Sequence, residues 1–479
     1  MINNFLRLLS VELNNIRNVS YGKLEFSEIK DTLEGNFSRS SDIIGLYGPN
    51  GSGKTAAIDA FDLLNKLVIN KDVLEKAKIK LKNIINDIVS SYSTDASIKY
   101  LFSLFNEGNR YLITYEIYFK KDISTNSFII SEEKLLSKIF NNNDTGQKWR
   151  KYSSSFDVNY LLSDKENIVS SIELTNNEFK DSLFDLYAAK EIAKNDSSSL
   201  LFSEAFKKIL LGGENSNKHK EDLFIISHLS NYVLGNFYVF NHRDYGVSLI
   251  GLLPIGFRNE NNDGSVLNGV TFINLFASNP IKESDLKLLN ISIDRINGIM
   301  PSFIKDFHID VNILNEQSLT NNEKGYLIDF SSVVNGTKIP LKDESDGIKK
   351  LISLIGFLNG VFNNEGVFLA VDEFDSGIFE YLLGQVLRSI NNYGKGQLFF
   401  TSHNLRCLEV LNSKDIIFTT TNPLDRYIHF SALKKTNNLR DKYIRAVQLG
   451  GEKEEMYNDT DESNIAAAFR KFGVNNNDE

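Results

Sequence analysis

A strand, a glycine-rich loop and a helix follow one another over residues 43–64, IIGLYGPNGSGKTAAIDAFDLL. Residues 48–55 satisfy the pattern G-x-x-x-x-G-K-[ST], in which backbone N–H groups converge on phosphate oxygens at a helix amino end. Apolar residues recur every three or four positions after the loop, which predicts a helix rather than a chance glycine turn. The lysine of this pattern reaches the β and γ phosphates, and the hydroxyl binds Mg²⁺. The predicted nucleotide-binding residues are Gly48, Asn50, Gly51, Ser52, Gly53, Lys54 and Thr55, with Thr55 also a Mg²⁺ ligand.

A second motif, VFLAVDEFDSGIFE over residues 367–380, is typical of a buried strand that ends in two carboxylates. An aspartate at such a strand end can hold Mg²⁺, and a glutamate beside it can polarise the attacking water. We therefore predict Asp372 as a metal ligand and Glu373 as the catalytic base. The alternative is a strand that merely ends in a polar turn.

A third apolar strand, LFFTSHN over residues 398–404, also ends in polar residues. Ligands of parallel sheets lie at the carboxyl ends of the strands, which predicts His403 as a catalytic residue near the γ phosphate. A lone histidine is more often structural or exposed, so this prediction depends on the other two motifs.

The phosphate loop and the acidic strand lie far apart in the sequence, which indicates a large insertion within one ATPase core. A guanine-reading N-K-x-D motif is absent, because Asn70, Lys71 and Asp72 have the wrong spacing. ATP is therefore favoured over GTP, with Mg²⁺ as the second cofactor.

Together the motifs resemble the ABC-type ATPases of the SMC and RecF group, especially the compact ones of bacterial anti-phage and abortive-infection systems. The resemblance depends on LLSVELNNIRNVSYGKLEF, GPNGSGKT, ESDGIKKL, and VDEFDSG followed by TSHN. It covers the two ends of the chain, roughly residues 1 to 120 and 305 to 430. Within these systems the sequence is similar to the ATPase components of PARIS and AbiL. The resemblance implies an α/β fold: an ABC-type P-loop ATPase head with a mixed sheet, flanking helices, an antiparallel β subdomain and a mainly helical insertion.

The resemblance also implies that ESDGIKKL is a degenerate ABC signature motif. Ser345, Asp346 and Gly347, here called the signature segment, would then contact the γ phosphate of ATP held on another protomer. The segment departs from LSGGQ, and Ile348 stands where a threonine is common. The alternative is a plain helix start, with Leu351, Ile352, Ile355 and Leu358 as its apolar stripe. By the same resemblance, Arg17 would approach the nucleotide, although an exposed turn arginine is equally compatible with the sequence.

The composition of the chain limits which nucleic-acid and membrane partners are expected. The formal net charge of −9 argues against a protein that coats nucleic acid, so any DNA contact would be local. The single cysteine fits a reducing compartment, and no apolar run is long enough to span a bilayer. We expect a cytoplasmic protein with no membrane partner.

The expected domains are an amino-terminal ATPase half (1–120), a mainly helical insertion lobe (121–305), a carboxyl-terminal ATPase half (306–450) and an acidic tail (451–479). Residues 96–120 alternate as an antiparallel pair of strands, and Asn335-Gly336 predicts a hairpin turn. Amphipathic segments such as SEEKLLSKIF and EDLFIISHLSNYVL predict the helical lobe.

These features favour an ATPase that acts as a sensor or regulator. It would form an ATP-bound homodimer, or a higher oligomer of dimers, that controls a separately encoded effector such as a Toprim-type nuclease. A phage-encoded trigger is an expected further partner. The main alternative is a RecF-like DNA repair or recombination ATPase that binds DNA, and a P-loop kinase is the third reading.

Overall fold

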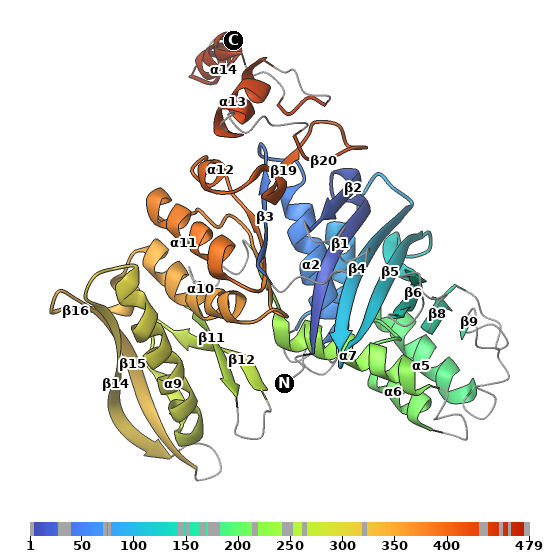
Figure 1. Ribbon diagram of the computed structural model, residues 1–479, viewed down its shortest axis with the longest axis horizontal. Coiled ribbons are helices and arrows are strands. Elements are labelled where there is room, and N and C mark those ends of the chain that lie inside the picture. Colours follow the sequence, from blue (N-terminus) through green and yellow to red (C-terminus); the bar gives the residue numbers. More distant parts are fainter. Residues whose placement is uncertain are drawn as a thin grey trace, which may run out of the picture.

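The computed structural model describes residues 4–26, 40–69, 74, 78–141, 148–149, 154–161, 169–170, 183–212, 219–241, 252–260, 266–318, 323–430, 439–449, 454–457 and 461–473. Figure 1 shows a central sheet with helices on both faces, a second sheet beside it and a smaller lobe at the lower left. No helix in these ranges is long and apolar enough to cross a membrane.

The central sheet has six strands in the order β10-β17-β18-β3-β19-β20. Four of its five pairings are parallel, and only β19 with β20 is antiparallel. Its strands are mostly buried on both faces, which is why they read as continuous apolar runs. The strands are β3 (Asp42–Tyr47), β10 (Phe237–Phe240), β17 (Phe368–Val371), β18 (Gln397–Thr401), β19 (Ile416–Thr419) and β20 (Tyr427–Ile428).

Helix α2 (Lys54–Val68) follows the phosphate loop and lies between the two sheets. Its Phe61 ring packs edge-on against Phe368 and Phe399 of the central sheet. On the other side, the Tyr100 hydroxyl of the second sheet donates to the Ala60 carbonyl at 2.6 Å. Most residues of α2 are therefore buried, and the less buried ones, Thr55, Asp62, Asn65 and Lys66, are polar.

The second sheet is antiparallel, in the order β2-β1-β4-β5-β6-β8-β9, with β7 also on β6. The predicted strand pair at residues 96–120 is confirmed as β4 with β5. The strands are β1 (Phe5–Ile16), β2 (Val19–Glu25), β4 (Asp95–Asn106), β5 (Asn109–Asp122), β6 (Ser127–Asn141), β7 (Lys148–Trp149), β8 (Ser154–Asn159) and β9 (Val169–Ser170). The fold is α/β with an antiparallel β subdomain, as predicted.

Residues 121–305 differ from the mainly helical lobe expected from the sequence. Helices α5 (Leu183–Asp196), α6 (Glu204–Leu211) and α7 (Lys220–Asn236) are present, but β6 to β9 extend the antiparallel sheet and β10 joins the central sheet. SEEKLLSKIF forms strand β6 because its buried residues alternate, including the polar Ser131, Glu133 and Ser137. Because these buried residues are polar, the sequence does not show the apolar–polar alternation that normally identifies a strand.

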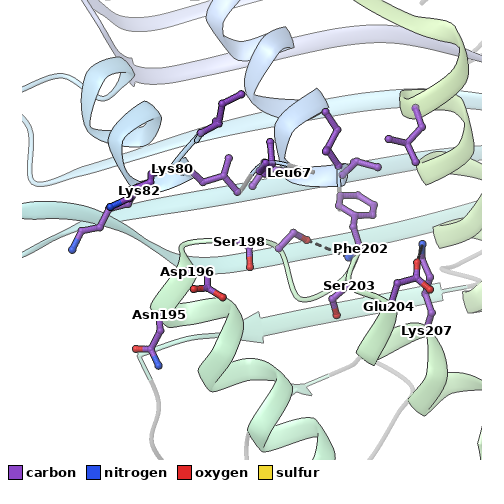
Figure 2. Close-up of a pocket in the computed structure, with 17 residues that line it drawn as sticks. Leu67, Lys80, Lys82, Asn195, Asp196, Ser198, Phe202, Ser203, Glu204 and Lys207 are labelled. Carbon is purple, nitrogen blue, oxygen red and sulfur yellow. Dashed lines mark hydrogen bonds and ion pairs between the residues drawn. The ribbon is translucent and has the colours of Figure 1, made fainter. Parts of the chain in front are cut away.

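Glu133 is fully buried and well satisfied by hydrogen bonds. Its carboxylate accepts from the hydroxyls of Tyr115 (2.7 Å) and Tyr160 (2.6 Å), and from the Leu200 N–H (3.1 Å) in the connection between α5 and α6. It thereby ties that connection to the antiparallel sheet. Beside it, a cavity of about 530 Å³ lies between α2, α4 (Leu81–Ile88) and the start of α6 (Figure 2).

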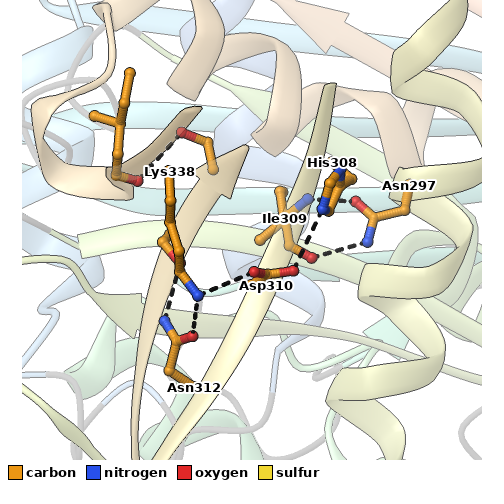
Figure 3. A network of polar contacts seen from close by, with 9 residues as sticks. Asn297, His308, Ile309, Asp310, Asn312 and Lys338 are labelled. Atoms are coloured by element: carbon orange, nitrogen blue, oxygen red, sulfur yellow. Dashed lines mark hydrogen bonds and ion pairs between the residues drawn. The ribbon is translucent and has the colours of Figure 1, made fainter. Parts of the chain in front are cut away.

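The smaller lobe contains β11 (Leu252–Glu260), β12 (Val266–Asn274), β13 (Asn279–Lys282), α9 (Glu283–Ile299), β14 (Phe307–Ser318), β15 (Lys324–Val334) and β16 (Thr337–Pro340). These elements share one apolar core, so the expected boundary at 305/306 divides a structural unit. The Asn297 side chain of α9 forms hydrogen bonds with both the N–H and the carbonyl of Ile309 on β14 (Figure 3). At the next residue of β14, the Asp310 carboxylate accepts a hydrogen bond from the Lys338 amine. The predicted turn is confirmed, because Asn335 and Gly336 both have positive φ and join β15 to β16.

Helix α10 (Asp346–Asn363) connects this lobe to the central sheet. Its predicted apolar stripe is confirmed, because Leu351, Ile352, Ile355 and Leu358 are all buried. Ile352 and Ile355 face the lobe, whereas Leu351 and Leu358 face the core shared with α11 (Glu380–Tyr393).

The carboxyl-terminal part contains α12 (Cys407–Val410), α13 (Leu439–Leu449) and α14 (Glu462–Gly473). The described part of the predicted acidic tail is partly packed, since Met456 is buried and Thr421 N–H donates to the Glu455 carbonyl at 2.7 Å. Residues 451–453, 458–460 and 474–479 of that tail lie outside the described residues.

Candidate nucleotide site

A cavity of about 360 Å³ lies at the carboxyl ends of β3, β17 and β18. This is the sheet edge at which parallel α/β folds bind ligands. It brings together most of the residues predicted from the three motifs. Its lining consists of Arg17, Asn18, Asn50, Gly51, Gly53, Lys54, Thr55, Ala56, Asp372, Glu373 and His403. Gly48 and Ser52 belong to the same loop but do not line the cavity.

The phosphate loop is held from behind by β19 and β20. Thr419 donates its hydroxyl hydrogen to the Ser52 Oγ at 2.7 Å, and Tyr427 donates to the Gly53 carbonyl at 2.7 Å. A Cβ on Gly48 would lie 1.6 Å from the Thr419 hydroxyl, so no larger residue fits there. Gly51 and Gly53 adopt positive φ values of 75° and 97°, which glycine permits without a steric penalty.

Lys54 is buried within the loop and donates to the carbonyls of Gly48 (2.7 Å) and Pro49 (2.9 Å). Burial lowers the pKa of the Lys54 amine, and the negative charges of Asp372, Glu373 and Asp375 oppose that change. A buried ammonium among carbonyl oxygens gains from an anionic partner. The environment of Lys54 therefore fits a phosphate.

Asp372 and Glu373 are fixed at the end of β17 through the hydroxyl of Thr401. This hydroxyl donates to the Asp372 Oδ1 at 2.6 Å and accepts from the Glu373 N–H at 2.7 Å. Glu373 has a φ of 46°, a conformation that costs a non-glycine residue about 1 kcal/mol or more and persists only where its surroundings enforce it. Backbone strain of this kind is common at functional sites.

His403 follows β18 at the rim of the cavity. Its backbone N–H donates to the Asp375 Oδ2 at 3.1 Å, which connects it to the loop after Glu373. Loss of water around the imidazole lowers the pKa of His403, and the positive charge of Lys54 lowers it further. The histidine is therefore neutral near pH 7 and can accept a proton or a hydrogen bond.

Arg17 lines the same cavity, and its guanidinium is paired with the Asp59 carboxylate of α2. Its neighbour Asn18 was not predicted, although its side-chain amide donates to the Gly51 carbonyl and it lines the same cavity. The sequence did contain a signal for Asn18, since this residue lies within LLSVELNNIRNVSYGKLEF, one of the segments on which the resemblance depends.

The signature segment does not line this cavity. Ser345 caps α10, because its side chain accepts from the Ile348 N–H at 3.3 Å, and both Ser345 and Asp346 are exposed. Gly347 is buried, and a Cβ there would lie 1.9 Å from the Gly377 carbonyl oxygen. The plain helix-start reading therefore holds within one chain, and Gly347 has a packing role that the sequence did not indicate.

The residues present fit a magnesium ion only together with a nucleotide. Thr55 and Asp372, the two predicted ligands, both line the cavity. In the described ranges, no group of three or more His, Cys, Asp or Glu side chains is arranged to hold a metal ion. An ion at this position would need phosphate oxygens to complete its coordination, as Mg²⁺ in nucleotide sites commonly does.

Comparison with known proteins supports the assignment of a nucleotide-binding loop. Residues 43–168 match the family model described as "AAA domain, putative AbiEii toxin, Type IV TA system". The matched residues include the phosphate loop and helix α2. The comparison of its sequence with curated proteins gave no match.

Among solved structures, the SMC head domain from Thermotoga maritima is 11% identical, with 89% of this chain and 100% of that chain covered and a TM-score of 0.32. The Smc head domain with a coiled coil and joint derived from Pyrococcus yayanosii is 9% identical, with 92% and 99% covered and a TM-score of 0.39. Similarities of this size carry no argument about substrate or partner.

Proposed function

We propose that this chain binds and hydrolyses ATP as the sensor or regulatory subunit of an anti-phage defence system. In this proposal, ATP held between two copies controls a separately encoded effector, for which a Toprim-type nuclease is the leading candidate. The observation that carries the proposal is the cavity at the strand ends, where the phosphate loop, the Asp372-Glu373 pair and His403 meet. The AAA domain description, which names an AbiEii toxin, supports the defence context.

The residues of the cavity have distinct proposed roles. Lys54 and the loop N–H groups would bind the phosphates, and Thr55 with Asp372 would hold Mg²⁺, which supplies charge neutralisation when it is bound. Glu373 would accept a proton from the attacking water, and the neutral His403 would hydrogen-bond at the γ phosphate. Arg17 would contact the nucleotide from the β1–β2 turn. Its pairing with Asp59 fixes it at the cavity wall.

The signature segment would complete the site of a second copy. Ser345 and Asp346 are exposed at the amino end of α10, where helix N–H groups favour an anion. Because the segment is absent from the cavity of its own chain, contact with a phosphate would require another protomer. The active form in this proposal is therefore a homodimer or an oligomer of dimers.

Glu373→Gln tests the catalytic assignment. Loss of a general base typically costs about 10²- to 10⁴-fold in rate, while the amide keeps the size of the side chain. We expect ATP hydrolysis to fall by that factor and an ATP-bound dimer to accumulate, as measured by phosphate release and by light scattering after size exclusion. Glu380→Gln, an exposed glutamate at the start of α11, is the matched control and should behave as wild type. Hydrolysis by Glu373→Gln at the wild-type rate would falsify this assignment.

Ser345→Arg tests the shared site. A bulky cation at the exposed helix start should block a second copy while leaving the cavity of its own chain unchanged. We expect ATP binding to persist, and both ATP-dependent dimerisation and hydrolysis to be lost. A Ser345→Arg protein that dimerises with ATP and hydrolyses it normally shows that the signature segment is not part of the site.

The effector is tested by co-expression with the product of the adjacent gene, followed by co-purification with and without ATP. We expect a complex whose stability changes with the nucleotide. Strong DNA binding with a steep dependence on salt would instead support the RecF-like alternative. A neighbouring gene that encodes neither a nuclease nor a toxin would contradict the regulatory role.

A further inference from the structure

The backbone N–H and the backbone carbonyl of Glu373 are each bonded by a residue that lies within a quoted motif but had no predicted role. Its N–H donates to the Thr401 Oγ1 at 2.7 Å. Its carbonyl accepts from the Lys350 Nζ at 2.5 Å. Thr401 ends β18 and Lys350 lies in α10, so two separate elements meet at this residue. The two contacts lie on either side of the positive φ of Glu373, a conformation that persists only where the surroundings enforce it, and the Glu373 carbonyl also accepts from the Ser376 N–H at 3.0 Å.

We propose that Thr401 and Lys350 form a clamp that positions Glu373 for hydrolysis, and that Lys350 links Glu373 to the signature segment at the start of the same helix. This inference rests on the proposed function, in which Glu373 is the base. Neither residue lines the cavity, so both are positioning residues rather than catalytic ones.

Thr401 acts through a single hydroxyl that is fully buried. It donates a hydrogen bond to the Asp372 Oδ1 at 2.6 Å and accepts one from the Glu373 N–H. One group therefore orients both the predicted metal ligand and the predicted base. Valine has nearly the same shape but can form neither bond, whereas serine keeps both.

Lys350 joins helix α10 to two residues of the loop that follows β17. Besides Glu373, its amine donates to the Ser376 carbonyl at 3.1 Å. Burial lowers the pKa of Lys350 to about 8, while the carboxylates of Asp375, Glu373 and Asp372 favour its charged form. One helical turn earlier, Gly347 packs directly on the Gly377 backbone.

These contacts connect the start of α10 directly to residues 373–377. A shift of Ser345–Gly347 against the nucleotide of a second copy would therefore reach the Glu373 carbonyl through Lys350. The clamp gives a physical route by which a partner protomer can influence the base of its neighbour.

The test compares four full-length variants: Thr401→Val, Thr401→Ser, Lys350→Met and Lys349→Met. Lys349 is the matched control, because it is the neighbouring lysine of α10 and its amine lies 3.5 Å from the Asp346 carboxylate, whereas that of Lys350 contacts the Glu373 carbonyl. We expect Thr401→Val and Lys350→Met to lower kcat about tenfold to a hundredfold with KM nearly unchanged, since misplaced groups lose rate rather than binding. Thr401→Ser should recover most of the loss, and Lys349→Met should match wild type.

The Mg²⁺ concentration for half-maximal rate separates the two clamp residues. It should rise in Thr401→Val, which also frees Asp372, and stay unchanged in Lys350→Met. The clamp is overturned if either variant keeps the wild-type kcat, or if Thr401→Ser is as slow as Thr401→Val. An inactive Glu373→Gln beside fully active clamp variants rejects the clamp alone. A fully active Glu373→Gln rejects the proposed base.

Discussion

At the scale of single residues, Gly347 shows how a glycine in a helix can be required by its neighbours. Glycine to alanine inside a helix is normally favourable by up to about 1 kcal/mol. Here a Cβ would lie 1.9 Å from the Gly377 carbonyl oxygen, so the helix or the loop would have to move. The steric cost is concentrated at the loop that carries Glu373.

We predict that Gly347→Ala lowers both the free energy of unfolding and the ATPase rate. The control is Gly360→Ala in the same helix, where a Cβ would meet only the Val367 side chain at 3.6 Å. That variant should be as stable as wild type or slightly more stable. Thermal unfolding and phosphate release on both proteins check the contrast, and equal behaviour of the two variants contradicts it.

At the scale of secondary-structure elements, Ser345 combines two roles that substitutions can separate. As the residue before α10, it caps the helix through the Ile348 N–H. Ser345→Ala should cost about 1 kcal/mol of stability. Ser345→Asp should keep the cap and the stability, but its negative charge would face the phosphate of a second copy. We predict normal denaturant unfolding for Ser345→Asp together with loss of ATP-dependent dimerisation. If Ser345→Asp still dimerises with ATP, the role of Ser345 is limited to capping helix α10.

The elements that could be predicted from the sequence are those with a local pattern. The phosphate loop, the apolar strands at Asp372 and His403 and the stripe of α10 each appear within a few consecutive residues. Strand β6 was missed because Glu133 lies on its buried face, where hydrogen bonds rather than apolar character satisfy it. Thr401 and Lys350 were missed for a different reason: their contacts to Glu373 join elements separated in the chain, and no local pattern records such contacts.

At the scale of the whole molecule, Glu133 makes stability depend on pH. Burial raises the pKa of its carboxyl above the ordinary 4.5, against the pull of its hydrogen-bond donors. The folded protein therefore holds this proton more tightly than the unfolded chain does. Its contribution to stability is complete below the unfolded pKa and is lost as pH rises through the folded pKa.

We predict that the free energy of unfolding of the wild type falls more steeply than that of Glu133→Gln as the pH rises above 4.5, the ordinary pKa of the carboxyl. Urea unfolding at several pH values gives the two slopes, and the exposed Glu107→Gln serves as control. Parallel slopes for wild type and Glu133→Gln would show that the carboxyl stays ionised in the folded protein.

The position of α2 between two sheets has a consequence for motion. Because α2 packs against both sheets, its buried residues cannot become exposed to solvent until the sheets separate from it. Its amide hydrogens should therefore be among the last in the chain to exchange with heavy water. In a hydrogen–deuterium exchange experiment, the slow exchange rate of α2 would then report how often the core between the two sheets unfolds.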